Sequence, residues 1–222
     1  MSMTRRVQVE CPKCRKEYDI TCWESLNGDL DPEAKERMLS GELFKEKCPS
    51  CGNRNNINYP LLYHGMEQKI MIKLASDSEQ NDWNPKGILD MLPILSPGTG
   101  ICTDEYRFRL VTSQHALREK VMIFECGLDD RAVEITKHLQ SKVVCKKYPG
   151  INLVDTFFYP AAPFQLEFYA DDNKSYTMEL NMEMYELISS AATSAMDNES
   201  RDCYSVGEDW AASFAAKYLN FV

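Results

Sequence analysis

The sequence predicts an α+β protein, in which antiparallel hairpins with an inserted helix come first and an acidic α+β domain follows. Two Cys-Pro-x-Cys pairs, Cys11–Cys14 and Cys48–Cys51, are each flanked by short alternating apolar segments, as at the bend of a hairpin. A segment with a helical start signal lies between the pairs. The later part of the chain mixes strand and helix patterns and carries almost all of the net negative charge.

The helix between the cysteine pairs is predicted over Pro32–Ser40. Asp31 suits the N-cap, and proline is favoured at the first helical position because its missing N–H has no partner there. Alternation of apolar residues predicts the strands of this part, which are Arg6–Glu10, Glu17–Cys22, Leu43–Lys47, Asn56–Leu62 and Lys69–Leu74.

The same patterns predict four helices and four strands in the second part of the chain. We expect strands over Tyr106–Val111, Leu153–Tyr159, Phe164–Tyr169 and Tyr176–Leu180. We expect helices over Ser113–Glu125, over a second segment capped by Asp129 or Asp130 with the stripe Ala132, Ile135, Leu139 and Val143, and over Met182–Ala195. A polar loop, Met196–Ser205, and a last helix, about Glu208–Leu219, complete the chain.

Composition divides the chain into three parts. Residues 1–74 hold 12 Lys and Arg against 11 Asp and Glu, whereas residues 75–222 hold 13 against 23, which together give the net charge of −9. Residues 75–103 are rich in Ser, Asn, Asp, Pro and Gly and are predicted to form a linker or long loop. We therefore expect a zinc-ribbon-like domain over 1–74 and an acidic α+β domain over 104–222.

Composition also excludes several classes of protein. Nine cysteines cannot all pair within one chain, which argues against a disulfide-bonded secreted scaffold. The acidic balance disfavours nucleic acid and anionic membranes as partners. Neither an apolar signal segment nor a long apolar run occurs, so we expect a cytoplasmic protein whose thiols are reduced.

The two cysteine pairs predict a closed Cys₄ zinc site made by Cys11, Cys14, Cys48 and Cys51. Each Cys-x-x-Cys turn places two thiolates at two corners of a tetrahedron, and two turns complete it. Gly52 follows the second pair, where a left-handed backbone is common, whereas Arg15 follows the first. The 33 residues between the pairs exceed the usual ~15–20, and the inserted helix accounts for the excess. Redox dithiols and disulfides are the alternatives.

The remaining candidates have ordinary structural interpretations beside the functional ones. Cys22 is a spare ligand or a buried small apolar residue. His64 is a ligand, a general base or a hydrogen-bonded turn histidine, and His115 and His138 are expected on solvated helix faces. Asp129–Asp130 is a carboxylate pair or an N-cap. No ligand spacing occurs at Cys102, Cys126, Cys145 or Cys203, which we interpret as core or inert thiols.

Two helical features also have a functional alternative. The helix–Gly–helix of residues 113–143 resembles a DNA-reading helix-turn-helix in outline, with Arg131, Lys137 and Lys142 as its basic residues. The stripe Trp210, Phe214 and Tyr218 is expected in the core, with a partner-facing helix as the alternative.

The residues around the cysteine pairs resemble the bacterial and archaeal CpXC domain proteins. The resemblance covers residues 9–64 and extends to the strand–helix–helix of residues 106–140. It implies paired cysteine ligands and a prokaryotic source, and it implies no activity. The positions that carry it are Cys11, Cys14, Trp23, Asn27, Asp31, Pro32, Gly41, Cys48, Cys51, Tyr59 and Pro60.

These observations favour a non-catalytic interaction or scaffold protein with one structural Zn²⁺, a protein partner and no membrane association. No catalytic residue and no organic cofactor site is predicted. A nucleic-acid-associated zinc ribbon is a second hypothesis, and an enzyme with its site between the two halves near His64 is a third. The nucleic-acid hypothesis depends on Arg5, Arg6, Lys13, Arg15, Lys16 and Arg54.

Overall fold

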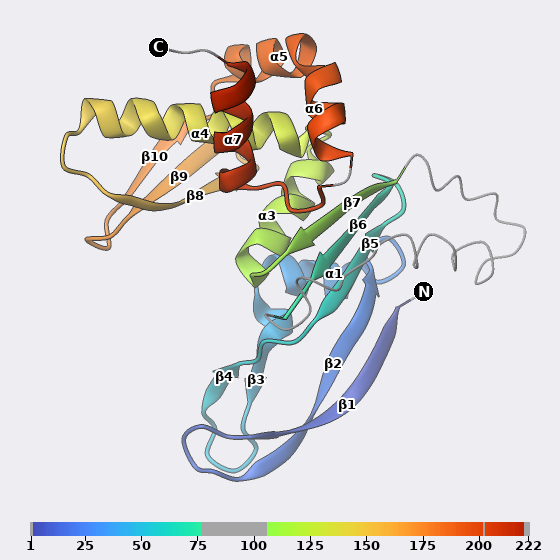
Figure 1. The fold of residues 1–222 in the computed structure, drawn as a ribbon. Helices are drawn as coiled ribbons and strands as arrows, with labels where there is room; N and C mark the ends of the chain where they lie inside the picture. Colours follow the sequence, from blue (N-terminus) through green and yellow to red (C-terminus); the bar gives the residue numbers. More distant parts are fainter. Residues whose placement is uncertain (1, 77–105, 202, 220–222) are drawn as a thin grey trace, which may run out of the picture. The chain divides into compact units, whose positions relative to one another are not determined.

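The computed structural model describes residues 2–76, 106–201 and 203–219, and it divides into two compact units, Met1–Arg118 and Glu119–Val222. Both units combine helices with strands, which confirms the predicted α+β class (Figure 1). Helix α3 (Gln114–Glu125) contains the boundary between the units. The predicted linker, 75–103, lies outside the described residues except for Ala75 and Ser76, and it stays a prediction.

The first unit is built on a five-stranded mixed sheet. Its spatial order is β1-β2-β5-β6-β7, with antiparallel β1/β2 and β5/β6 pairs and parallel β2/β5 and β6/β7 pairs. The last strand was expected in the acidic domain, but it pairs with β6 and forms an edge of this sheet. The strands are β1 (Met3–Glu10), β2 (Glu17–Asn27), β5 (Leu61–Gly65), β6 (Ile70–Leu74) and β7 (Arg107–Val111).

A short hairpin and a helix lie between β2 and β5. Helix α1 (Pro32–Leu39) begins after Asp31, as predicted, but the Asp31 carboxylate accepts a hydrogen bond from Ser2 and does not cap the helix. A 3₁₀ turn (Glu42–Phe44) leads into strands β3 (Lys45–Lys47) and β4 (Arg54–Asn56). The expected continuous strand Asn56–Leu62 is wrong, because Pro60 has no N–H for a ladder and separates β4 from β5.

A close backbone approach holds the end of β2 against β5. The Gly28 N–H donates to the His64 carbonyl at 2.9 Å, and a Cβ at Gly28 would lie only 2.3 Å from the Tyr63 Oη. Tyr63 is 1% exposed and has no room to move aside. The position therefore requires glycine for steric reasons.

Replacing Gly28 with alanine is expected to lower the free energy of unfolding by about 1–3 kcal/mol, because the added methyl group overpacks the site against Tyr63. Urea unfolding followed by circular dichroism measures the change. Gly207→Ala is the matched control, since no described atom lies within 4 Å of a Cβ there. Equal stability of the two variants would contradict the steric argument.

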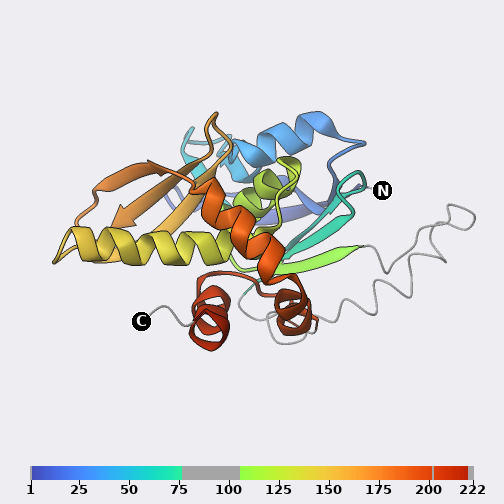
Figure 2. The same ribbon diagram turned by 90° about the horizontal axis from the view of Figure 1, so that it is seen from above.

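The second unit contains a three-stranded antiparallel sheet in the order β10-β9-β8. The predicted hairpin is present as its β9/β10 pair. Figures 1 and 2 show α4 lying along this sheet. The elements are α4 (Asp130–Lys147), β8 (Leu153–Tyr159), β9 (Gln165–Ala170), β10 (Ser175–Glu179), α5 (Met182–Ala191), α6 (Thr193–Ser200) and α7 (Glu208–Tyr218).

Helix α4 is the centre of the second core. It contacts β8, α5 and α7, so several of its faces are covered. Ala132 and Ile135 of the predicted stripe are fully buried, but Val143 is exposed because the buried surface of α4 extends around the helix instead of along one stripe. The buried apolar side chains that surround α4 include Phe158, Leu166, Phe168, Ile188, Met196 and Phe214.

The segment Met196–Ser205 was expected to be a polar loop, and its first residues are helical. Helix α6 forms although Ser, Thr, Asp and Asn are weak helix formers. Met196 is 1% exposed and belongs to the core cluster, so one buried apolar side chain positions the helix.

None of the described helices has the length and hydropathy that crossing a membrane requires.

Candidate metal centre

The four cysteines of the two pairs come together in the first unit. Cys11 and Cys14 lie in the turn between β1 and β2, which closes at the Glu10–Glu17 pair. Cys48 and Cys51 lie in the turn between β3 and β4. The two hairpins lie side by side in Figure 1, and the four Sγ atoms lie within 4.8 Å of one another.

The two turns share one backbone geometry. In the first, the Cys11 N–H donates to the Lys16 carbonyl at 3.0 Å and the Arg15 N–H donates to the Cys11 carbonyl at 2.9 Å. The second turn repeats this pattern with Cys48, Gly52 and Asn53, at 2.9 Å for both bonds. Gly52 has φ of 72°, and Arg15 adopts 62° at the matching position. The absence of glycine after the first pair therefore leaves the turn unchanged.

The distances between sulfur atoms fit a tetrahedral metal ion. Cys11 Sγ lies 3.7 Å from Cys51 Sγ, and Cys14 Sγ lies 3.7 Å from Cys48 Sγ. A tetrahedron with metal–sulfur bonds of about 2.3 Å has edges of about 3.8 Å. A disulfide would need about 2.05 Å, and all four cysteines are free thiols. The four cysteines could therefore hold one metal ion.

The protonation of these thiols is uneven. The pKa of Cys11 is lowered to about 6, chiefly because the Cys14 backbone N–H donates to its sulfur. The Asn53 backbone N–H favours the Cys51 thiolate, yet desolvation and the three neighbouring cysteines raise the pKa of Cys51 to about 11. Four thiolates at this spacing repel one another, and a divalent cation would offset that repulsion.

The groups around the sulfur atoms orient the site. Cys11 and Cys48 are buried, whereas Cys51 is exposed. The Asn55 side chain donates to the Tyr18 hydroxyl at 2.9 Å, and its Nδ2 lies 3.9 Å from Cys11 Sγ. Such outer contacts fix the position of a ligand sulfur before a metal binds.

None of the remaining described cysteines joins the four-thiol cluster. Cys22 is 2% exposed on β2, where burial raises its pKa, which supports its interpretation as a buried small residue. Cys126 and Cys203 are half-buried, and Cys145 is exposed. Cys102 lies outside the described residues. The four-cysteine group is the one cluster of three or more potential ligands among the described residues.

The three histidines are held within the structure. His64 on β5 has its Nε2 2.9 Å from the Tyr106 hydroxyl and its Nδ1 3.4 Å from the Asn27 side-chain nitrogen. No carboxylate among the described residues hydrogen-bonds to it. His115 and His138 are half-buried with shielded Nε2 atoms, so the expected solvated faces are wrong for both.

The pKa of His64 is lowered, first because burial disfavours its cation and second because the N-terminal charge repels it. The unfolded state then binds more protons just below the ordinary pKa of about 6.5, so stability should fall as the pH falls from 7 toward 5. Thermal melting in this range should show a smaller pH dependence for His64→Gln than for the wild type. His138, whose pKa is also lowered by burial, supplies part of the remaining dependence. An unchanged pH dependence in His64→Gln would contradict this assignment.

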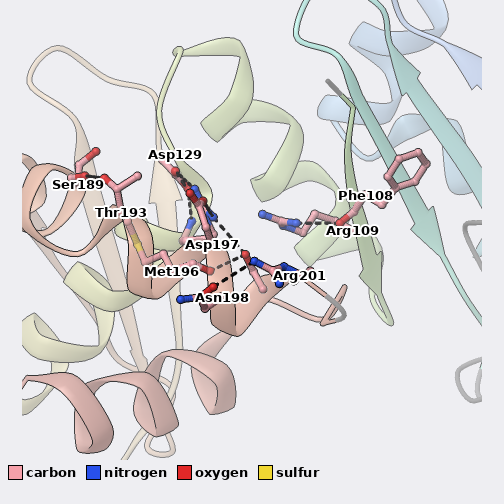
Figure 3. A network of polar contacts seen from close by, with 11 residues as sticks. Phe108, Arg109, Asp129, Ser189, Thr193, Met196, Asp197, Asn198 and Arg201 are labelled. Carbon is pink, nitrogen blue, oxygen red and sulfur yellow. Dashed lines mark hydrogen bonds and ion pairs between the residues drawn. The ribbon is translucent and has the colours of Figure 1, made fainter. Parts of the chain in front are cut away.

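The second unit carries a polar network that the sequence did not predict. Asp129 caps α4, as expected, by accepting from the Arg131 N–H, and it also accepts from the Arg131 guanidinium. Arg131 Nη1 reaches Asp197 of α6 at 2.7 Å, and Arg201 Nη2 donates to Asn198 at 3.1 Å. Figure 3 shows Asp129, Asp197, Asn198 and Arg201, and separately the 2.8 Å bond from Arg109 to the Phe108 carbonyl in β7.

These contacts and the aromatic stripe bear on the two helical alternatives. Arg131 and Lys137 are both buried in ion pairs and are not presented on an exposed reading face. In the stripe on α7, Phe214 is 2% exposed and Tyr218 is 40% exposed. The stripe is therefore part of the core at Phe214 and reaches the surface at Tyr218, whose hydroxyl donates to Glu199.

The fold and the cysteine cluster define a class of protein, in which two Cys-x-x-Cys hairpin turns on a mixed sheet could hold one metal ion. The model of the CpXC protein family matches residues 9–137, more than half of the chain, and the chain belongs to this family. The match contains all four cysteines, β7 and α3. Comparisons with curated proteins and with solved structures found no match.

Proposed function

We propose that this chain is a non-catalytic zinc protein whose Cys₄ site stabilises the two hairpins and lets them serve as an interaction or scaffold surface. The observation that supports it most directly is the pair of 3.7 Å Sγ–Sγ distances, which match the edge of a zinc–sulfur tetrahedron. Four thiolates favour Zn²⁺ or iron among common metals, and Zn²⁺ is the usual occupant of a closed structural site.

A closed ligand set argues for a structural role. Four protein ligands leave no position for water or substrate, so the metal would have no open site for hydrolysis. Cys48 and Cys51 lie in the turn between β3 and β4, which contain three residues each and form a separate two-stranded sheet. Strands this short need an additional stabilising contact, which bound zinc would supply.

A protein partner fits the charges around the turns better than a nucleic acid does. Of the six basic residues that favoured nucleic acid, three form ion pairs, namely Arg5 with Glu24, Arg15 with Glu10 and Arg54 with Glu42. These pairs neutralise much of the positive surface that a phosphate backbone would need. In a gel-shift experiment with nucleic acid, absence of a shift at low salt would agree with a protein partner. A shift with a steep salt dependence would contradict it.

Native mass spectrometry tests the metal. The full chain, purified without added metal, should carry one Zn²⁺ per chain, and chelation should remove it with a loss of structure. Iron instead of zinc would produce a visible absorption band from sulfur-to-iron charge transfer and would overturn the assignment to zinc.

A turnover screen tests the non-catalytic part of the proposal. The zinc-loaded chain should hydrolyse none of the common ester, phosphoester and peptide probes. Hydrolysis that disappears in His64→Ala while zinc content is unchanged would overturn it and would favour the enzyme hypothesis near His64.

Cross-linking in the native cell tests the protein partner. It should join a partner to lysines of the hairpins, such as Lys13 and Lys16. Cross-links confined to the second unit would contradict a hairpin interface.

A further inference from the structure

The first unit contains a cavity of about 480 Å³ away from the cysteine cluster. It lies at the carboxyl ends of the parallel strands β6 and β7, where β7 turns into α3. A volume of this size is typical of sites for small molecules, and the carboxyl ends of parallel strands are a frequent location for them. The described residues that line it are Gly41, Asn56, Asn58, Tyr59, Leu74, Ala75, Ser76, Thr112, Ser113, Gln114, His115 and Arg118.

The lining has the opposite charge character from the chain as a whole. The chain has a net charge of −9, yet no described residue that lines the cavity is acidic. Arg118 contributes a permanent positive charge. An anion would therefore find attraction here without a carboxylate to repel it.

The Arg118 guanidinium is held by a hydrogen bond at Nε, and its two terminal nitrogens are left as donors. Its Nε donates to the Leu39 carbonyl, at the end of α1, at 2.6 Å. The guanidinium lies beside the turn at Gly41, where a Cβ would be in ordinary van der Waals contact with Nη1, at 3.6 Å. Among the described residues, no hydrogen-bond acceptor is found for Nη1 or Nη2. The guanidinium is thus positioned by Leu39 and still has donors for an oxyanion.

Neutral donors surround this guanidinium. Gln114 Nε2 donates to the Asn58 Oδ1 at 2.6 Å and to the Ile57 carbonyl at 3.1 Å. The side-chain oxygen of Asn58 is thus occupied, which leaves the NH₂ group of the same side chain as a donor. Thr112 and Ser113 add hydroxyl groups where the helix begins. Several donors from different elements therefore converge on one cavity.

We propose that this cavity binds a small phosphate ester, with Arg118 holding the phosphate group. A carboxylate presents two oxygens in a plane, which a single guanidinium satisfies. A phosphate group presents three oxygens in different directions, and the hydroxyl and amide donors of Thr112, Ser113 and Asn58 fit the oxygens that Arg118 leaves unbound. The proposal does not depend on zinc, because none of the four cysteines lines the cavity.

Nuclear magnetic resonance of the ¹⁵N-labelled full chain tests the proposal. Glycerol 3-phosphate and inorganic phosphate should each shift the backbone signals of Thr112, Ser113 and Gln114 saturably, whereas citrate at matched ionic strength should not. Arg118→Gln should weaken phosphate binding by about tenfold or more, since it removes a charge-assisted bond. Arg6→Gln, which removes an exposed arginine on β1, should leave it unchanged.

Two outcomes of the titration decide against the proposal. Absence of a saturable shift with both phosphates overturns it, and saturation by citrate alone replaces the phosphate ester with a carboxylate. If Arg118→Gln disturbs the fold through the lost Leu39 contact, Arg118→Lys and Asn58→Ala provide the test. Lysine at position 118 retains the positive charge but lacks the two parallel N–H donors of the guanidinium, and alanine at position 58 lacks the amide donor. Both variants should therefore bind phosphate more weakly than the wild type. Unchanged binding in both would overturn the proposal.

Discussion

Replacing Cys48 with serine should release the metal and unfold the two hairpins of the first unit. Cys48 is 1% exposed, and its sulfur lies 3.7 Å from that of Cys14, so a hydroxyl there removes a buried ligand. In small zinc domains the energy of metal binding, on the order of 10–16 kcal/mol, is also folding energy. Loss of one ligand forfeits a large share of it, which makes this the largest effect that we expect from a single substitution.

Circular dichroism melting together with zinc content measures the effect. The variant should show less strand signal at low temperature and should resemble the wild type after chelation. Cys145→Ser is the matched control, because Cys145 is an exposed thiol outside the cluster. Zinc retained at one equivalent with an unchanged melting curve in Cys48→Ser would refute the site.

The cysteine cluster was predictable because its signal is local. A Cys-x-x-Cys turn specifies its own geometry, and two such turns flanked by alternating residues place four thiols on two hairpins. The structure repeats one hydrogen-bond pattern in both turns, even though Arg15 replaces the favoured glycine in the first. Helix α1 was predictable for a similar reason, since Asp31 and Pro32 mark its start in the sequence.

The arrangement of the sheet was not predictable from the same signals. Alternation identifies a strand but not its neighbour, and the parallel pairs β2/β5 and β6/β7 join segments that are far apart in the chain. Assigning β7 to the acidic domain followed from composition alone. The cavity was missed for the same reason, because its residues come from β4, β6, the start of α3 and the loops between them.

Buried charges were the second feature that the sequence did not indicate. Lys120 contacts Asp130 at 3.1 Å and Glu134 at 2.8 Å, and Lys137 contacts Glu134 at 3.2 Å and Glu119 at 2.6 Å. All five side chains are at most 8% exposed. Charged residues on a helix usually face water, so a pattern of charges predicts a solvated face. Their burial depends on α4 being covered by its neighbours, which is a property of the tertiary fold.

The electrostatic balance of this cluster depends on its two lysines. Burial raises the pKa of Glu119 despite the attraction of Lys137. Burial acts the same way on Glu134, but Lys120 and Lys137 together hold its pKa below the ordinary value. Burial opposes the charge on Lys137 as well, yet Glu119 and Glu134 raise its pKa. Loss of Lys137 would therefore remove a positive charge from two buried carboxylates, Glu119 and Glu134.

Replacing Lys137 with methionine should lower the free energy of unfolding by about 3–5 kcal/mol, the usual cost of removing one partner from a buried ion pair. Urea unfolding of the full chain at pH 7, followed by circular dichroism, measures the loss. Lys142→Met, at an exposed position of the same helix, is the matched control and should change stability little. A loss in Lys137→Met no larger than in the control would show that the cluster is well hydrated.

A second substitution distinguishes lost charge balance from lost packing. Glu119 accepts a hydrogen bond from the Phe158 N–H at 2.7 Å, and glutamine retains that acceptor without the charge. Glu119→Gln combined with Lys137→Met should therefore be more stable than Lys137→Met alone. Lowering the pH should act in the same direction, because Lys137 lowers the pKa of Glu119, and its loss favours proton uptake on Glu119 in the folded variant more than in the folded wild type. The stability gap between Lys137→Met and the wild type should accordingly narrow from pH 7 to pH 5, whereas a gap caused by lost methylene packing would stay constant.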